Sequence, residues 1–352
     1  MPGAGDAPSD RLRERAGGSR LKLWLLMDAD RWLVTALLVA VVFVTLTGVG
    51  SLLPAAEIAI RSGDSVDTLF QALLTATITG VTLVLTLNQL VLSQELGAAG
   101  DQRERMEEAM AFREDVADVV GAPVSPSRPA QFLRALVQVS GGRARDLREA
   151  VGLDAATGAG TPDEDLQAAV EDLTDSLIEN ADAVATGLDD ARFGEFDVTA
   201  SALDFNYSWK IFTARRIHER YGDTLAEESQ VALEQLTDAL ELFGPAREHF
   251  KTLYFQWDLI DLSRHILAVS IPALLVSTSM ITFFDPTAHA PTIAGFDALV
   301  PLVAAMTTVA LAPFLLLLAY VVRIATVTKH TLSIGPFILR ETDDVAEVEW
   351  DR

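Results

Sequence analysis

The chain of 352 residues contains no cysteine. Disulfide bonds and thiolate metal sites are therefore excluded, and exposed segments must be stable without covalent cross-links. Lysine is also scarce, since only four of the 27 basic residues are lysine, whereas 50 residues are acidic. The formal net charge of −23 makes a nucleic-acid partner unsuitable, because binding to phosphates requires a basic surface.

Motifs for catalysis and cofactor binding are missing from the sequence. There is no HExxH, Walker A, GxSxG or dinucleotide-binding pattern. The five histidines lie far apart and form no i,i+4 pair that would bind a metal. The glycine-rich run at 157–160 follows no strand and is interpreted as a linker. We therefore expect a protein that is not an enzyme, with no catalytic residue, no cofactor and no metal site.

Long runs without charge are present, although the chain as a whole is acidic. Half of the residues are hydrophobic, and the mean hydropathy is +0.27. Four such windows, each about 20 residues or longer, could cross a hydrocarbon core of ~30 Å as helices. They lie near residues 32–53, 69–92, 265–284 and 298–322. No segment has the alternation of a strand, so the sequence predicts an all-α integral membrane protein with four transmembrane helices.

The acidic residues are concentrated between the second and third windows. Residues 94–262 contain 34 Asp and Glu against 15 Lys and Arg. The predicted plan is two transmembrane hairpins with a helical bundle inserted between spans two and three. Its segments are an N-terminal segment (1–31), hairpin 1 (32–93), an acidic helical domain (94–262), hairpin 2 (263–322) and a C-terminal tail (323–352).

The distribution of basic residues predicts the orientation in the cell membrane. The loop at 54–66 has only Arg61, and the loop at 285–296 has no basic residue, whereas the other flanks of the spans carry several. By the positive-inside rule, both termini and the acidic domain are expected in the cytoplasm. The first window is too long for a signal peptide and is expected to remain as a span.

Within the acidic domain the sequence predicts several helices. Span two is expected to continue unbroken into an amphipathic helix that ends near Val120. Further helices are expected at about 130–150, from Thr161 with a capping box, at about 198–221, and at about 223–243 up to a break at Gly244-Pro245. A heptad-like seam is formed by Leu166, Val170, Leu173, Leu177, Ala181, Val184 and Leu188.

The second span carries a polar stripe along its whole length. The stripe consists of Thr68, Gln71, Thr75, Thr79, Thr82, Thr86, Gln89 and Ser93. Steps of three and four residues keep these side chains on one helix face. Two interpretations remain open: the small residues allow close helix packing, or the stripe faces water and lines a pore. Its extent and its two glutamines favour the pore.

Two charged groups accompany the stripe as further candidates. Glu57, Asp64 and Asp67 are expected at the outer mouth, where acidic rings raise the local cation concentration, although they could simply keep a loop solvated. A basic cluster in the acidic domain could contact an anion or a lipid headgroup, although pairing with nearby carboxylates is an alternative. It consists of Lys210, Arg215, Arg216 and Arg220.

Two hairpins with an inserted cytoplasmic helical domain resemble the layout of bestrophin channels, whose second span lines a pentameric pore. In this resemblance Thr75 to Ser93 occupy the corresponding helix. Proton-driven stator proteins share the topology and have a proline in span three, where this chain has Pro272. The acidic, lysine-poor composition resembles that of haloarchaeal membrane proteins and indicates adaptation to high salt.

The expected function is therefore an oligomeric ion channel with a passive pore along span two and a weak preference for cations. The expected partners are the lipid bilayer, further copies of the chain and ions. A non-conducting scaffold or signalling module, which recruits a partner through the acidic domain, is an alternative. A stator-like subunit is a second alternative.

Overall fold

The computed structural model describes residues 24–62, 64–95, 97–157, 164–189, 191, 196–285, 292–293 and 296–331. Helices make up nearly all of the described chain, which confirms the all-α class. The helical elements are η1 (Trp24–Asp28), α3 (Arg31–Leu52), α4 (Pro54–Arg61), α5 (Asp64–Glu95), α6 (Ala99–Val120), α7 (Pro129–Thr157), α8 (Glu164–Asp189), α9 (Phe196–Leu203), α10 (Tyr207–Tyr221), η2 (Gly222–Thr224), α11 (Glu227–Phe283) and α12 (Leu299–Thr331). Two strands of two residues each, β1 (Thr292–Ile293) and β2 (Phe296–Asp297), form a small antiparallel pair before α12.

Four of these helices are long and apolar enough to cross a membrane, as the sequence predicts. They are α3, α5, α11 and α12. The described chain divides into two compact units. The span unit comprises Trp24–Gly97 and Gln256–Thr326, and the acidic unit has Ala98–Phe255 as its main segment. Helix α11 contributes its first part to the acidic unit and its last part to the span unit.

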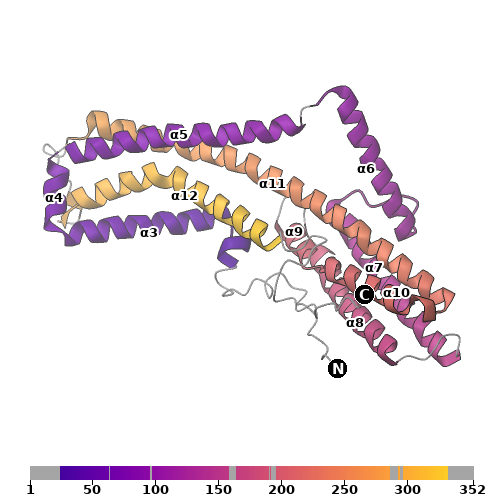
Figure 1. Ribbon diagram of the computed structural model, residues 1–352. Coiled ribbons are helices and arrows are strands. Elements are labelled where there is room, and N and C mark those ends of the chain that lie inside the picture. Colours follow the sequence, from indigo (N-terminus) through magenta and orange to yellow (C-terminus); the bar gives the residue numbers. More distant parts are fainter. Residues whose placement is uncertain are drawn as a thin grey trace, which may run out of the picture. The chain divides into compact units, whose positions relative to one another are not determined.

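Helix α12 is the central element of the span unit, with α3 on one side and α5 on the other (Figure 1). One apolar cluster near α4 joins α5, α11 and α12 through Phe70, Met280 and Val303, among others. A second cluster farther along the same helices contains Val84 of α5 and Leu316 of α12. Helix α3 packs on α12 through few residues.

Helix α3 is peripheral in the span unit. Its side chains Leu37, Val41 and Val44 are exposed. At its α4 end, Gly50 approaches α12 so closely that a Cβ atom there would lie 2.6 Å from Val300 Cγ1. This contact needs glycine, and it holds α3 against α12 where the rest of the helix has little cover.

The acidic unit is organised around the pair α7 and α8. The seven seam residues predicted on α8 are all buried, which confirms the heptad-like pattern. Ion pairs line the edge of this pair, for example Arg145 with Asp182 at 3.2 Å and Arg148 with Asp175 at 2.5 Å. Because these pairs are partly exposed, they contribute little free energy compared with the buried leucines.

The single helix predicted at 198–221 was wrong, because it is divided into α9 and α10. Asn180 of α8 holds the intervening turn: its Nδ2 donates to the carbonyl of Asp204 (2.8 Å), and its Oδ1 accepts from the backbone N–H of Asn206 (3.3 Å). A buried amide that bonds the turn backbone replaces the helical hydrogen bonds that are lost there. This long-range contact has no local signal in the sequence.

Two further boundary predictions were wrong. Helix α5 ends at Glu95 and α6 begins at Ala99, since Ala98 is extended and its N–H donates to the Asp101 carboxylate. Conversely, α11 continues through Gly244-Pro245. The Tyr207 ring packs so closely on Gly244 that an added Cβ would lie 2.9 Å from it. Tertiary packing thus outweighs the hydrogen bond that a proline removes.

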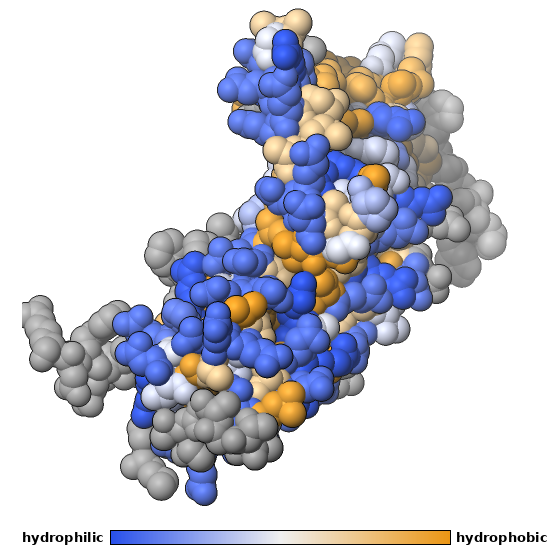
Figure 2. Space-filling view, turned by 90° about the vertical axis from the view of Figure 1, so that its right-hand side faces the viewer, coloured by the Kyte–Doolittle hydropathy of each residue, from blue (hydrophilic) through white to orange (hydrophobic). Residues whose placement is uncertain are grey.

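The face of the acidic unit that carries α6, α7 and α10 is mostly hydrophilic, and small groups of hydrophobic residues lie between the hydrophilic ones (Figure 2). Met106, Met110 and Val124 are exposed among the charged side chains. Such single apolar residues are normal on a soluble surface. The predicted capping box at Thr161 lies outside the described residues.

Candidate functional site

Helix α5 has a buried apolar face, and the polar stripe lies on the opposite side, where exposed apolar residues such as Ile78, Leu83 and Leu90 flank it. The buried face consists of Val66, Phe70, Leu73, Thr77 and Val84. All eight residues of the predicted stripe are exposed. At 3.6 residues per turn, the centres of the two sets lie about 180° apart around the helix. The stripe therefore points directly away from the core of its own chain.

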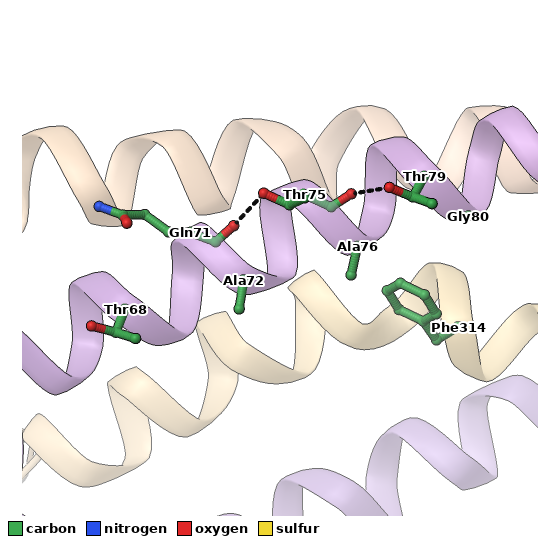
Figure 3. Close-up of a pocket in the computed structure, with 8 residues that line it drawn as sticks. All are labelled: Thr68, Gln71, Ala72, Thr75, Ala76, Thr79, Gly80 and Phe314. Carbon is green, nitrogen blue, oxygen red and sulfur yellow. Dashed lines mark hydrogen bonds between the residues drawn. The ribbon is translucent and has the colours of Figure 1, made fainter.

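Five of the six hydroxyl groups of the stripe are bonded to the backbone of α5. Thr75 Oγ1 donates to the carbonyl of Gln71 (3.0 Å), and Thr79 Oγ1 donates to that of Thr75 (2.9 Å), as Figure 3 shows. Thr82, Thr86 and Ser93 make equivalent bonds to carbonyls one turn earlier. The four described threonine bonds span four residues, the usual pattern for threonine in helices.

These bonds determine what the stripe can offer to a ligand. A hydroxyl has one donor and two acceptor lone pairs. Since the proton is used by the backbone, the outer side of each bonded oxygen presents acceptors. The threonine part of the stripe is therefore a column of partly negative oxygen atoms. Such a surface favours a cation or the hydrogen atoms of water over an anion.

An open groove of about 720 Å³ runs along the first half of the stripe. Its lining is Thr68, Gln71, Ala72, Thr75, Ala76, Thr79, Gly80 and Phe314. In Figure 3 the alanines point toward α12, and the Phe314 ring of α12 closes the groove against Gly80. A Cβ atom at Gly80 would be 3.4 Å from that ring, so the two helices are in contact there.

The three acidic residues predicted at the outer mouth lie at the α4 end of α5. Glu57 accepts from Arg61 Nε at 2.8 Å within α4, so much of its charge is compensated. Asp64 and Asp67 lie in the first turn of α5. Negative charge is favourable there because backbone N–H groups at a helix N-terminus point toward it. This local role accounts for both aspartates without a pore.

The predicted basic cluster is divided by the structure. Lys210 is fully buried and donates from Nζ to Asn180 Oδ1 at 3.1 Å, so its inclusion in an anion-binding surface was wrong. Arg215, Arg216 and Arg220 are exposed, and Arg215 pairs with Glu241 at 2.7 Å. Burial of a lysine depends on tertiary contacts that the local sequence does not reveal. For the remaining three arginines, a contact with an anion or a lipid headgroup stays a prediction.

A contact that the sequence analysis missed joins three helices at the end of the span unit opposite α4. His265 Nδ1 of α11 lies 2.8 Å from the Tyr320 hydroxyl of α12. The Trp32 ring of α3 packs edge-on against His265, with 5.1 Å between the ring centroids. Arg31 and Arg323, next to this chain of rings, are both more than nine-tenths buried. In the sequence, the only sign of this contact is that these residues lie near the ends of the predicted spans.

Exposed tryptophans mark the same end of the span unit. The side chains of Trp24, Trp32 and Trp257 are about half exposed. Tryptophan favours the boundary between water and hydrocarbon, because its ring is apolar and its N–H needs a polar partner. Their position supports a membrane boundary at this level.

Among the described residues, no group of three or more His, Asp or Glu could hold a metal ion.

Comparisons with known proteins give the family and nothing beyond it. No curated protein matches the chain, and no solved structure matches it either. One family model, described as a family of unknown function (DUF7972), matches residues 2–352. Because the match covers nearly the whole chain, the protein belongs to the DUF7972 family.

Proposed function

We propose that the protein is a subunit of an oligomeric ion channel in the cell membrane, in which the α5 stripes of several copies line a passive pore. The observation that carries the proposal is the orientation of α5. Its apolar face packs against α11 and α12, whereas the polar stripe lies on the opposite, exposed side of α5 and borders α12 only along the groove that Phe314 lines. A single chain therefore leaves its most polar membrane-level surface without cover.

Contact with lipid hydrocarbon is energetically unfavourable for the polar stripe. The two glutamine amides of the stripe, Gln71 and Gln89, are exposed, and in hydrocarbon an amide without a partner costs several kcal/mol. A closed ring of copies would turn each stripe toward the axis, where water can solvate the amides. Closed cyclic symmetry of this kind is common among homo-oligomers of soluble proteins.

The chemistry of the stripe supports passive conduction with a weak preference for cations. Acceptor oxygens face outward along the threonine column, and the stripe contains no ionisable side chain. Conduction that is coupled to a proton or to sodium ordinarily uses a buried carboxylate, histidine or lysine. Selectivity from neutral oxygens alone is modest, since it depends on pore diameter and on the number of dipoles.

In this proposal α4 lies at the outer face, and both termini and the acidic unit are cytoplasmic, as the positive-inside rule indicates. The tryptophans Trp24, Trp32 and Trp257 then lie at the inner boundary. The excess of carboxylates in the acidic unit would raise the local concentration of cations in the cytoplasm around that unit.

A second candidate is a non-conducting scaffold, in which the stripe packs dry against another helix. The self-bonded hydroxyls favour it, because Thr75 and Thr79 need no water to be satisfied. Small hydroxyl residues also allow close helix contact in membranes. This candidate retains the oligomer and predicts no ion flux.

Reconstituted liposomes distinguish the two candidates. Thr79→Arg and Thr82→Arg each place a fixed positive charge on the axis and should strongly reduce cation flux. Thr45→Arg is the matched control, since Thr45 is an exposed threonine on the peripheral helix α3. Cation flux that is the same in the wild type and in both stripe variants, or no flux in the wild type, would contradict the channel and favour the scaffold.

A further inference from the structure

The first part of helix α6 has no cover from the rest of the described chain. Every residue from Ala99 to Ala111 is exposed. The helix is held at its other end, where Val116 is buried and the Phe112 ring packs on Phe132 of α7, with 6.1 Å between the ring centroids. Helices in proteins gain most of their stability from packing of an apolar face, so an uncovered segment of this length calls for a partner.

The face of α6 that packs on the rest of the acidic unit continues into the exposed part. Ala117 is buried, and Arg113, one turn earlier, lies over the Phe132 ring at 6.0 Å and donates to the carbonyl of Ser125 at 2.9 Å. Met110 and Met106 lie seven and eleven residues before Ala117, which places them within about 20° of the same line. They are 48% and 64% exposed. Single exposed apolar residues are ordinary, but these two extend a face that is covered elsewhere.

Charged residues border the two methionines on both sides. Arg105 precedes Met106 and Glu107 follows it, so the two charges lie on opposite flanks. An apolar line of this narrow width is typical of a helix that packs along another helix. A helix that lies in the surface of a membrane has a broader apolar face and is rich in basic residues. The pattern on α6 therefore favours a second helix as the partner.

The charge of this segment favours a second copy of the chain. Residues 99–113 contain four acidic and three basic residues, whereas residues 94–262 as a whole contain 34 acidic and 15 basic ones. Copies therefore repel one another over most of the acidic unit, since like charges meet there. Along α6 the charges nearly balance. In a ring of parallel helices, the Arg105 flank of one copy also meets the Glu107 flank of the next, which brings opposite charges together.

The covalent connection to α5 brings the copies of this segment near one another in the proposed ring. Only residues 96–98 separate the end of α5 at Glu95 from the start of α6 at Ala99. Four residue steps of extended chain span at most about 14 Å, so each α6 begins close to the end of its own α5. If the α5 helices surround an axis, the α6 helices begin around the same axis.

We propose that the segment from Ala99 to Ala111 packs against the same segment of neighbouring copies, with Met106 and Met110 in the contact. The inference rests on the proposed function, because the ring supplies the neighbouring copies. In the proposed orientation the packed segments form a helical neck on the cytoplasmic side of the pore. Methionine suits such a contact, because its unbranched thioether adapts to an irregular surface.

The test is oxidative cross-linking of the full chain in proteoliposomes, in a sequence that has no cysteine of its own. Met106→Cys and Met110→Cys, made one at a time, should convert most of the chains to disulfide-linked dimers. A disulfide needs Cα atoms about 4.4–6.8 Å apart, so it reports direct contact. Glu104→Cys and Glu108→Cys are the matched controls, because both residues are exposed and lie on the side of the segment opposite the methionines. They should leave the chains as monomers.

Cross-links at the methionine and glutamate positions alike, or at neither, would overturn the inference. If neither position cross-links, faster labelling of Met106→Cys by a lipid-soluble maleimide than by a water-soluble one identifies the membrane surface as the partner instead. The mass of the wild-type particle in detergent separates this result from the proposed function. A ring without cross-links at the methionines overturns the α6 contact alone, whereas a particle of one chain overturns the ring and the contact together.

Discussion

The absence of cysteine makes the environment of the α5 stripe directly measurable. Each stripe position can be changed to cysteine, one at a time, in a chain that has no other thiol. Thr79→Cys is the most informative change, because Thr79 is exposed and lies midway along the helix. A thiol is similar in size to the hydroxyl and methyl group that it replaces, so helix packing should be retained.

The expected magnitude follows from thiolate chemistry. Only the thiolate reacts with a methanethiosulfonate reagent, and the pKa of a free thiol is about 8.5. Burial in apolar surroundings raises a thiol pKa by up to roughly three to five units. Each unit lowers the thiolate fraction tenfold. A thiol in a water-filled pore should therefore react roughly a thousand times faster than one in lipid or in a dry interface.

The assay measures the rate of labelling by a charged, membrane-impermeant reagent in proteoliposomes. Val84→Cys, on the buried face of α5, and Val44→Cys, on the exposed face of α3, are the controls. Rates should peak at Thr75, Thr79 and Thr82, where the stripe recurs. If Thr79→Cys reacts as slowly as Val44→Cys, the stripe is dry and the reasoning that places it in water is wrong.

Two further predictions concern the acidic unit. Leu177→Ala should lower the free energy of unfolding, measured by denaturant titration, by about 2–5 kcal/mol, because Leu177 is fully buried in the α8 seam. The control Glu179→Ala, on the exposed side of α8, should change this free energy by less than about 0.5 kcal/mol. Burial raises the pKa of Glu248, but hydrogen bonds and charge from Lys251 and Arg247 outweigh it, so the net pKa is lowered. A lowered carboxyl pKa contributes stability above its unfolded value of 4.5, and this stability is lost as the pH falls through the folded pKa. As the pH is lowered from 6 to acid values, the melting temperature of Glu248→Gln should therefore decrease less than that of the wild type. An equal decrease in the variant and the wild type would refute the ion pairing.

The features that the sequence predicted correctly are those with a strong local pattern. Charge-free windows of sufficient length identified the four helices that can cross a membrane. The leucines at heptad spacing on α8 are buried, since a helix with one apolar stripe must cover it. The stripe on α5 is exposed as a whole, because helical periodicity places all its members on one side.

The features that the sequence did not predict depend on contacts between distant residues. Gly244-Pro245 ends helices by local rules, yet α11 continues there because Tyr207 packs on the glycine. Lys210 looked like a surface cation, but Asn180, 30 residues earlier, provides it with a buried partner. The central position of α12 among the span helices likewise has no signature in its composition. These are tertiary effects that outweigh local propensity.

The central claim is that α5 faces the axis of a ring. Electron microscopy of the full chain in lipid nanodiscs, viewed along the membrane normal, tests this claim most directly. We predict a closed symmetric ring whose innermost helix in every subunit is α5, with α3 at the rim. A single copy per nanodisc, or a ring with α3 or α12 innermost and the α5 stripe away from the axis, would contradict the account.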